Sequence, residues 1–280
     1  MDQTLTRPPL ENAAHPLTPR QYGAVNWVGL WTLCLRETRR FWKVGMQTLF
    51  APVVSSLLML FVFKLAFGQG GGALVGGVPF EVFLAPGVVM MAILNNAFAN
   101  TSSSLIIAKV QGNSVDFMMP PLSPGELTVG FLSGAVTRGV LVGIVTYAAI
   151  WILQINPFQV ANLGAVIFFS VIASLFMGCV GLIGGIWADK FDHMAAVQNF
   201  VIMPLTMLSG TFYPIGRLPE PFVTISHFNP FFYMIDGFRY GFTGHAESNL
   251  WIGGGFCLAI TLALTGWCWA LLRSGYKLKA

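Results

Sequence analysis

The residue types that most often catalyse reactions or bind metals are sparse in this sequence and far apart. The four histidines, His15, His193, His227 and His245, include no pair at four-residue spacing, so the pattern of a helical metal site is absent. The four cysteines form no Cys-x-x-Cys pair, and three lie inside apolar segments, as small core residues do. The sequence therefore predicts neither a metal site nor a disulfide framework.

Carboxylates and glycines offer two further candidate sites, and neither is specific. Asp189 and Asp192 flank Lys190, and we interpret them as solvated charges at the end of a membrane span rather than as an acid–base pair. The glycine-rich segment 68–77 lacks the Lys-Ser/Thr of a phosphate-binding loop, and the sequence contains no Walker motif. We therefore predict that the chain is not an enzyme and binds no cofactor directly.

Arg138 is the ionisable residue that lies most plainly inside an apolar run. It is about ten residues into the run 128–153, or roughly 15 Å along a helix. An ionisable group at that depth is a functional candidate, although its long side chain also has the option of snorkelling to the headgroups. The first five apolar runs contain no carboxylate, so a proton or sodium relay is poorly supplied.

The composition predicts an all-α polytopic membrane protein. Hydrophobic residues make up 55% of the sequence and charged residues only 9%, whereas soluble domains carry about 25% charged residues. The net charge of +4 does not indicate nucleic-acid binding, because the basic residues lie beside apolar runs. Six runs are each long enough to cross a hydrocarbon core of about 30 Å. They are 46–67, 82–105, 128–153, 161–187, 195–213 and 249–272.

The basic residues also predict how these spans are oriented. With both termini in the cytoplasm, eleven of the fifteen Lys and Arg residues fall on the cytoplasmic side. Residues 1–25 are proline-rich and polar, which predicts a disordered cytoplasmic tail. Residues 26–44 carry tryptophans and a basic stripe at helical spacing, which predicts an amphipathic helix in the membrane interface or, alternatively, an ordinary solvated helix. The remaining residues, 45–280, form the predicted transmembrane domain.

Two connecting segments have unusual patterns. Between the second and third runs, Lys109 to Met119 mixes polar and apolar residues before three prolines, which predicts a short amphipathic helix with a cytoplasmic docking surface. The segment 200–242 begins apolar, breaks at glycines and prolines, and becomes apolar again. We predict that it re-enters the outer face as two short helices, with a soluble loop as the alternative. Asp236 and Arg239 are predicted to pair on the exposed face of the second helix.

Small residues recur four positions apart in the third and fourth runs. Examples are Gly130 with Gly134, and Gly181 with Gly185. Such faces let membrane helices approach closely, and they predict tight packing either within one subunit or between two.

Together these features resemble the permease subunits of ABC-2 type transporters from residue 26 onward. The resemblance rests on APGVVMMAILNNAFANTSSSL, on the loop ending FMMPPLSPGEL, on GGIWADKFD, and above all on LSGTFYPIGRLPEPFVTISHFNPFFYMIDGFRYGF. It implies that the loop after the second span couples to a separate ATPase and that the segment before the last span gates the outer face. The implied coupling residues are Lys109, Val110, Val115, Asp116, Phe117, Met118 and Met119. The implied gate residues are Tyr213, Pro214, Phe228, Phe231, Phe232, Asp236 and Arg239.

The resemblance further implies a multi-pass permease of the bacterial inner membrane that exports its substrate as a dimer, most simply a homodimer. ATP would be hydrolysed by the partner ATPase, and membrane lipids would surround the spans. Many relatives carry an acidic coupling segment, whereas this sequence has Gln111, Gly112 and Asn113 there. A stand-alone secondary transporter or channel is the alternative, and the substrate, whether glycan, lipid or drug, stays open.

Overall fold

The computed structural model describes residues 23–43, 45–67, 74–75, 78–113, 119–153 and 160–277. The regular secondary structure of this part of the chain is helical except for one antiparallel hairpin, β1 (Leu74–Val75) with β2 (Val78–Pro79). The α-helices are α1 (Trp27–Lys43), α2 (Ala51–Phe67), α3 (Phe80–Val110), α5 (Pro124–Ile152), α6 (Leu163–Trp187), α7 (Phe191–Val197), α8 (Met203–Met207), α9 (Glu220–His227), α10 (Pro230–Thr243) and α11 (Leu250–Ser274). The π-helices η1 (Met46–Phe50) and η3 (Gln198–Ile202) and the 3₁₀ turn η4 (Ile215–Arg217) complete the set.

Five described helical segments are long and apolar enough to cross a membrane. They are Gln47–Ala66, Phe80–Val110, Pro124–Ile152, Leu163–Trp187 and Leu250–Ser274. The central one is α3: in its apolar 18-residue stretch 78% of the residues are buried within the protein, against 17% in the first segment and 22% in the last. The chain is therefore an all-α membrane protein built around α3, with α2 and α11 at its periphery.

The predicted fifth span, 195–213, is not one long helix. Helical backbone runs through α7, η3 and α8, which contribute 7, 5 and 5 residues, and then turns at 208–210. The predicted run extends to residue 213, but α8 ends at Met207. Two features end it early: Ser209 bonds back to the Thr206 carbonyl, and Gly210 adopts a left-handed φ of 71°. The structure therefore shows five long helices that could span a membrane, and the sixth span stays a prediction.

Local sequence signals set where α5 begins. At α5 the Ser123 hydroxyl accepts the Glu126 amide, and Glu126 Oε2 accepts the Ser123 amide at 2.6 Å, forming a capping box. Pro124 follows at the first helical position, where its missing N–H costs nothing. The other Glu126 oxygen accepts the Asn26 amide, which joins the start of α1 to the start of α5. This span therefore begins four residues earlier than hydropathy alone suggests.

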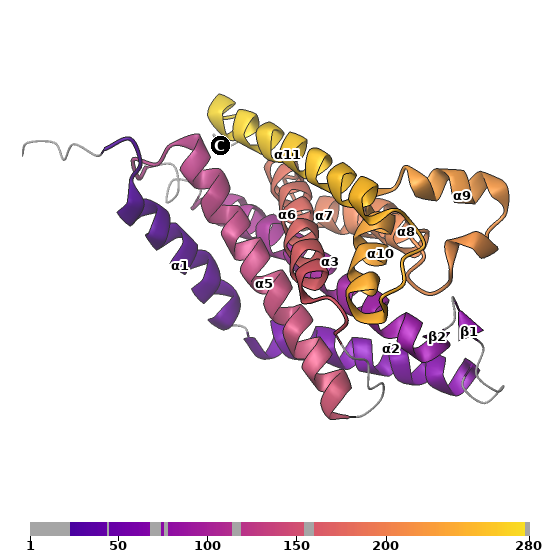
Figure 1. Cartoon of the computed structure of the whole chain (residues 1–280). Helices are drawn as coiled ribbons and strands as arrows, with labels where there is room; N and C mark the ends of the chain where they lie inside the picture. The colour runs from indigo at the N-terminus through magenta and orange to yellow at the C-terminus, as the bar shows by residue number, and fades with distance from the viewer. Residues whose placement is uncertain are drawn as a thin grey trace, which may run out of the picture.

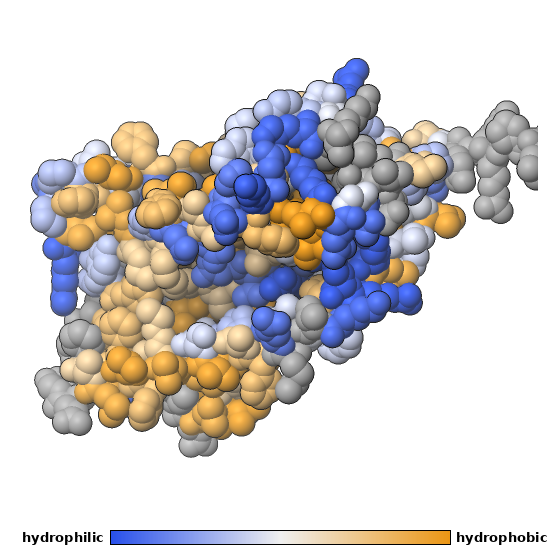
Figure 2. All heavy atoms as spheres, turned by 180° about the vertical axis from the view of Figure 1, so that it is seen from behind, coloured by the Kyte–Doolittle hydropathy of each residue, from blue (hydrophilic) through white to orange (hydrophobic). Residues whose placement is uncertain are grey.

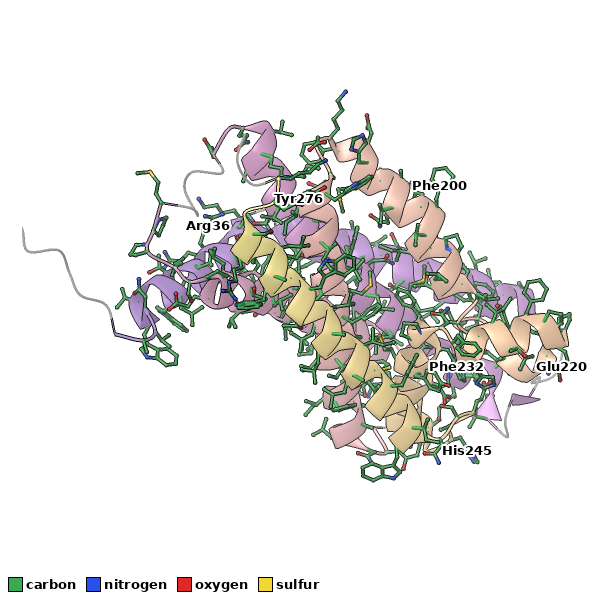
Figure 3. The ribbon with its side chains drawn as sticks, turned by 90° about the horizontal axis from the view of Figure 1, so that it is seen from above. Arg36, Phe200, Glu220, Phe232, His245 and Tyr276 are labelled. Atoms are coloured by element: carbon green, nitrogen blue, oxygen red, sulfur yellow. The ribbon has the colours of Figure 1, made fainter. Side chains whose placement is uncertain are left out.

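The two ends of the bundle carry different elements. α1 lies at the same end as the C-terminal turn of α11, whereas α9 and the β1–β2 hairpin lie at the opposite end (Figure 1). Seen from above, Arg36 and Tyr276 lie toward the first end, and Glu220 and His245 toward the second (Figure 3). This arrangement separates the predicted interfacial helix from the predicted outer gate.

The small-residue faces pack within this one chain. A Cβ added at Gly134 would lie 2.7 Å from the Cβ of Glu37, and one at Gly181 would lie 2.5 Å from the Phe98 carbonyl. Real Cβ atoms do not approach other atoms so closely, so these glycines allow α5 to touch α1 and α6 to touch α3. Of the two interpretations of these residues, the structure supports packing within one subunit.

Candidate functional site

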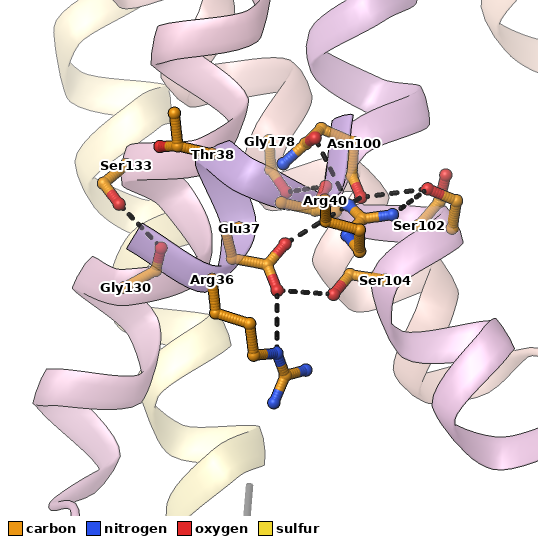
Figure 4. Close-up of polar contacts among 12 residues, drawn as sticks. Arg36, Glu37, Thr38, Arg40, Asn100, Ser102, Ser104, Gly130, Ser133 and Gly178 are labelled. Carbon is orange, nitrogen blue, oxygen red and sulfur yellow. Dashed lines mark hydrogen bonds and ion pairs between the residues drawn. The ribbon is translucent and has the colours of Figure 1, made fainter. Parts of the chain in front are cut away.

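A buried ion cluster joins α1 to α3 (Figure 4). Glu37 is 0% exposed, and its carboxylate pairs with Arg40 at 3.2 Å and with Arg36 at 3.7 Å. Ser104 donates its hydroxyl to the same carboxylate at 2.8 Å. A buried carboxylate is tolerated only when it is paired and hydrogen-bonded, and here both conditions hold. Sequence analysis missed Glu37, although its position next to Arg36 and three residues before Arg40 was a usable signal.

Arg40 extends this cluster across α3. Its Nη2 donates to the Asn100 carbonyl at 2.6 Å, and its Nη1 donates to the Ser103 hydroxyl at 3.0 Å. The predicted basic stripe of α1 is therefore not uniformly solvated, since this arginine turns inward. The tryptophans Trp27, Trp31 and Trp42 are 72%, 66% and 64% exposed. The helix is amphipathic, with aromatic side chains facing outward and a charged residue locked against the bundle.

Arg138 lies at the midpoint of the 29-residue helix α5. About 21 Å of helix separates it from either end, which is too far for its side chain to reach a headgroup region along the axis. Instead its Nη2 donates to Asn96 Oδ1 on α3 at 3.0 Å. Within the described part of the chain no carboxylate forms an ion pair with it. Of the two interpretations of Arg138, the geometry favours pairing inside the bundle over snorkelling.

A cavity of about 840 Å³ opens beside Arg138. Its lining comes from the end of α1 and from η1, α2, α3, α5 and η3, and it combines apolar side chains such as Met59 and Met91 with polar ones. Figure 2 shows the protein from behind. Hydrophobic side chains lie along the lower edge of this view, where α2 lies, and hydrophilic side chains extend into its middle. The larger polar lining residues are Arg40, Gln47, Asn95, Asn96, Arg138 and Gln198.

A second arginine, Arg239 of α10, is enclosed by protein. It is 4% exposed, donates Nε to the Phe83 carbonyl at 3.1 Å and donates Nη2 to the Gly210 carbonyl at 2.7 Å. Its guanidinium carbon also lies 3.7 Å from the centroid of the Phe83 ring, and Glu247 pairs with it at 3.8 Å. Burial lowers the pKa of Arg239 to about 10, so it stays charged at neutral pH.

Asp236, the other member of the predicted i, i+3 pair, bonds elsewhere. It is 1% exposed and accepts the backbone amides of Glu247 and Ser248, each at 2.9 Å, and the Ser248 hydroxyl at 2.6 Å. The prediction that Asp236 and Arg239 pair on an exposed helix face was therefore wrong. The reason is that α10 packs against α3 and α6, so both side chains face the bundle and meet partners from other segments.

The aromatic residues of the predicted gate divide into a buried set and an exposed set. Phe231 and Phe232 are 3% and 2% exposed, and Phe231 packs edge-on against Phe176 of α6 with ring centroids 5.5 Å apart. Tyr213 donates its hydroxyl to the Met207 carbonyl at 3.0 Å, and Pro214 beside it is half-buried. Phe228 follows α9 as its C-cap and is 77% exposed, so it is not buried within this chain as Phe231 and Phe232 are.

The predicted coupling segment is only partly described. Lys109 is in the last turn of α3, where its Nζ donates to the carbonyls of Ile186 and Ala188 at the end of α6. Val110 and Met119 are 57% and 79% exposed. The residues Val115, Asp116, Phe117 and Met118 lie outside the described part of the chain, so the docking assignment stays a prediction.

The architecture and the polar interior define a multi-pass α-helical membrane protein with a cavity inside its bundle. The sequence model of the ABC-2 type transporter family matches residues 28–243, which is most of the chain. The protein therefore belongs to the ABC-2 type transporter membrane family.

Two relatives show how far this similarity extends. The inner membrane transport permease YadH of Escherichia coli strain K12 is 35% identical over 254 residues, covering 91% of this chain and 98% of YadH. Nodulation protein J of Neorhizobium galegae is 27% identical over 252 residues, covering 86% of this chain and 90% of that protein.

Proposed function

We propose that this protein is the permease subunit of an ATP-driven exporter in the bacterial inner membrane. The observation that carries the proposal is the family match over residues 28–243, joined to a relative of nearly equal length that is named as an inner membrane transport permease. Such a subunit does no covalent chemistry. It converts ATP-driven closure of its partner into a shift between inward-open and outward-open states.

In this proposal the chain crosses the membrane six times, with both termini in the cytoplasm. The continuous helical stretch from α7 to α8 is the fifth span, and α9 and α10 form the re-entrant outer layer. Two features support this topology: the placement of eleven of fifteen basic residues on one side, and the position of α9 at the end of the bundle opposite α1.

Cysteines at Leu218 and Thr243 test the outer layer in the otherwise wild-type permease. Both positions are expected to react with a membrane-impermeant thiol reagent applied from outside the cell. A cysteine at Ala280 is the matched inner control and is expected to react only after the membrane is opened. Labelling of either outer position exclusively from the cytoplasm would contradict the re-entrant arrangement.

The surface supports an assembly larger than one chain. α2 exposes Leu58, Phe61 and Leu65 at 64%, 52% and 53%, and Phe200 of η3 is 81% exposed. Lipid covers part of such a surface, and a second permease copy is proposed to cover the rest. The ATPase is proposed to dock on the loop 108–127, where Val110 and Met119 present apolar side chains at the end of the bundle that carries α1.

The alternative of a stand-alone ion-coupled transporter has less support. The carboxylates of the five described spans, Glu81 and Glu126, lie in the first turn of their helices, and Glu126 belongs to a capping box. Neither is placed at mid-membrane, where a proton or sodium relay would need it. Energy from a separate ATPase fits this distribution of charge better.

Purification from the native membrane tests the proposed function. A permease tagged at its C terminus is expected to copurify with an ABC ATPase, and the complex in proteoliposomes should hydrolyse ATP. The variant Met119→Asp should reduce recovery of the ATPase, whereas Phe228→Asp, which changes an equally exposed apolar residue at the end of α9, far from the proposed docking loop, serves as the control. Transport driven by an ion gradient in the absence of any ATPase would contradict the proposal.

A further inference from the structure

The cavity beside Arg138 has an unbalanced charge. Two of its lining residues, Arg40 and Arg138, are cationic, and none of the described lining residues is acidic. The two guanidinium groups are close enough to interact electrostatically. Glu37 offsets the charge of Arg40 by a direct ion pair, which leaves the charge of Arg138 without a counterion among the described residues.

The hydrogen-bonding capacity of these arginines is also incompletely used. The Nε atoms of both Arg40 and Arg138 are buried and have no partner within the described part of the chain. The guanidinium of Arg138 is held by one neutral amide, Asn96. Desolvated cations of this kind are costly unless an anion or several acceptors reach them. A planar guanidinium is well matched to the oxygens of a phosphate group.

The remaining lining specifies more than a small anion. Asn95 and Gln198 add amide donors beside the arginines, whereas Met59, Val88 and Met91 present apolar surface in the same cavity. The cavity volume of about 840 Å³ is far larger than a phosphate ion and lies within the range of small-molecule sites. Next to it, the exposed face of α2 carries Leu58 and Phe61 toward the surroundings of the bundle.

We propose that this cavity binds the phosphate-bearing headgroup of an anionic amphiphile, with Arg138 contacting the phosphate and the apolar chain leaving along α2. The inference rests on the proposed permease function and narrows its substrate class to amphiphiles that carry a phosphate. Polar amides contact the headgroup, and the methionines contact the first methylene groups.

Equilibrium binding to the purified permease in a neutral detergent tests this proposal without the ATPase. The probe is a fluorescently labelled phosphatidylglycerol, and the competitors are unlabelled phosphatidylglycerol, diacylglycerol and inorganic phosphate. Phosphatidylglycerol is expected to displace the probe, and the other two are not. Displacement by diacylglycerol would show that the chain alone is recognised, and displacement by phosphate would show a small-anion site; either result overturns the proposal.

Two matched pairs of variants locate the site. Arg138→Gln is expected to weaken binding about tenfold or more, because it removes a charge-assisted hydrogen bond. Arg217→Gln removes the same charge from the exposed turn η4 and should leave binding unchanged. If Arg138→Gln does not yield a monodisperse protein, Ser55→Phe fills the cavity from α2 and should weaken binding, whereas Val54→Phe outside the cavity should not.

Equal binding by the cavity variants and their controls would overturn the proposal. That outcome would leave the permease function standing as long as the wild-type chain still copurifies with its ATPase. Loss of ATPase copurification with intact, Arg138-dependent binding would instead contradict the permease proposal alone.

Discussion

Arg138 and Arg239 are both arginines in an apolar helix bundle, yet the protein uses them differently. Arg239 donates to two backbone carbonyls, lies over the Phe83 ring and pairs with Glu247. Arg138 has one amide partner and faces a cavity. A guanidinium whose donors all have partners within the protein stabilises the fold. A guanidinium with donors that lack a protein partner can bind a ligand. The comparison therefore distinguishes a structural arginine in α10 from an arginine at the middle of α5 that we propose to bind a ligand.

The largest effect should come from Arg239→Gln. This change leaves the buried Phe83 and Gly210 carbonyls without their donor, and each unsatisfied buried acceptor costs about 1–3 kcal/mol, while the ion pair with the partly exposed Glu247 is also lost. Thermal unfolding in detergent should show a large decrease in Tm. An unchanged Tm would contradict a structural role for Arg239 and therefore its contrast with Arg138.

Glu37→Gln should have the next largest effect. The neutral amide weakens the charge-assisted bonds to Arg40 and Arg36, for a loss of about 1.5–3 kcal/mol. The change also releases the charge of Arg40 beside the cavity, so binding of phosphatidylglycerol should strengthen while the protein becomes less stable. A loss of both stability and binding would contradict the idea that Glu37 limits the positive charge of the cavity.

Asp236→Asn should have a smaller effect on stability. One carboxylate oxygen becomes an amide donor and can no longer accept from Ser248, whereas the other still accepts from Glu247, so about 1–2 kcal/mol is lost. Asn229→Ala, which removes the N-cap of α10, should cost a similar amount of about 1 kcal/mol. Denaturant titration of both variants would show whether the contacts at the start of α10 and those of Asp236 stabilise this helix equally.

Arg138→Gln should change stability least, by less than about 1 kcal/mol, because only one hydrogen bond to a neutral amide is lost and a desolvated charge is removed with it. Unfolding of this variant beside Arg239→Gln in the same detergent makes the contrast quantitative. A loss as large as that of Arg239→Gln would make both arginines structural.

Periodicity and hydropathy predicted the helices that have a distinct apolar surface. The amphipathic helix expected at 26–44 is α1, Trp27–Lys43, and the run 161–187 is α6, Leu163–Trp187. These predictions were possible because lipid-facing helices must satisfy their own backbone and bury an apolar surface, which leaves a strong sequence signal. The fifth run was predicted as one continuous span, but the structure interrupts it. The interruptions are a π-segment and a left-handed glycine, and neither changes the hydropathy of the sequence.

The contacts of the charged residues were not predictable in the same way. Arg239 bonds to a residue 156 positions away, and Arg40 to one 60 positions away. Sequence spacing suggested the local partner Asp236 for Arg239, and tertiary packing overrode that suggestion because α10 is enclosed by α3 and α6. Arg138 was identified from its depth in an apolar run, but its partner Asn96 and the cavity beside it required the packed bundle.

The most direct test of a ligand-accessible cavity compares two serine-to-cysteine variants in a Cys34→Ser background. Ser56 lines the cavity, and Ser226 of α9 is buried with its hydroxyl bonded to the Leu208 carbonyl. A water-soluble anionic thiol reagent should modify Ser56→Cys in the folded permease, more slowly when phosphatidylglycerol is added, and should not modify Ser226→Cys. Equal reactivity at the two positions, or labelling of Ser56→Cys that phosphatidylglycerol does not slow, would contradict the account.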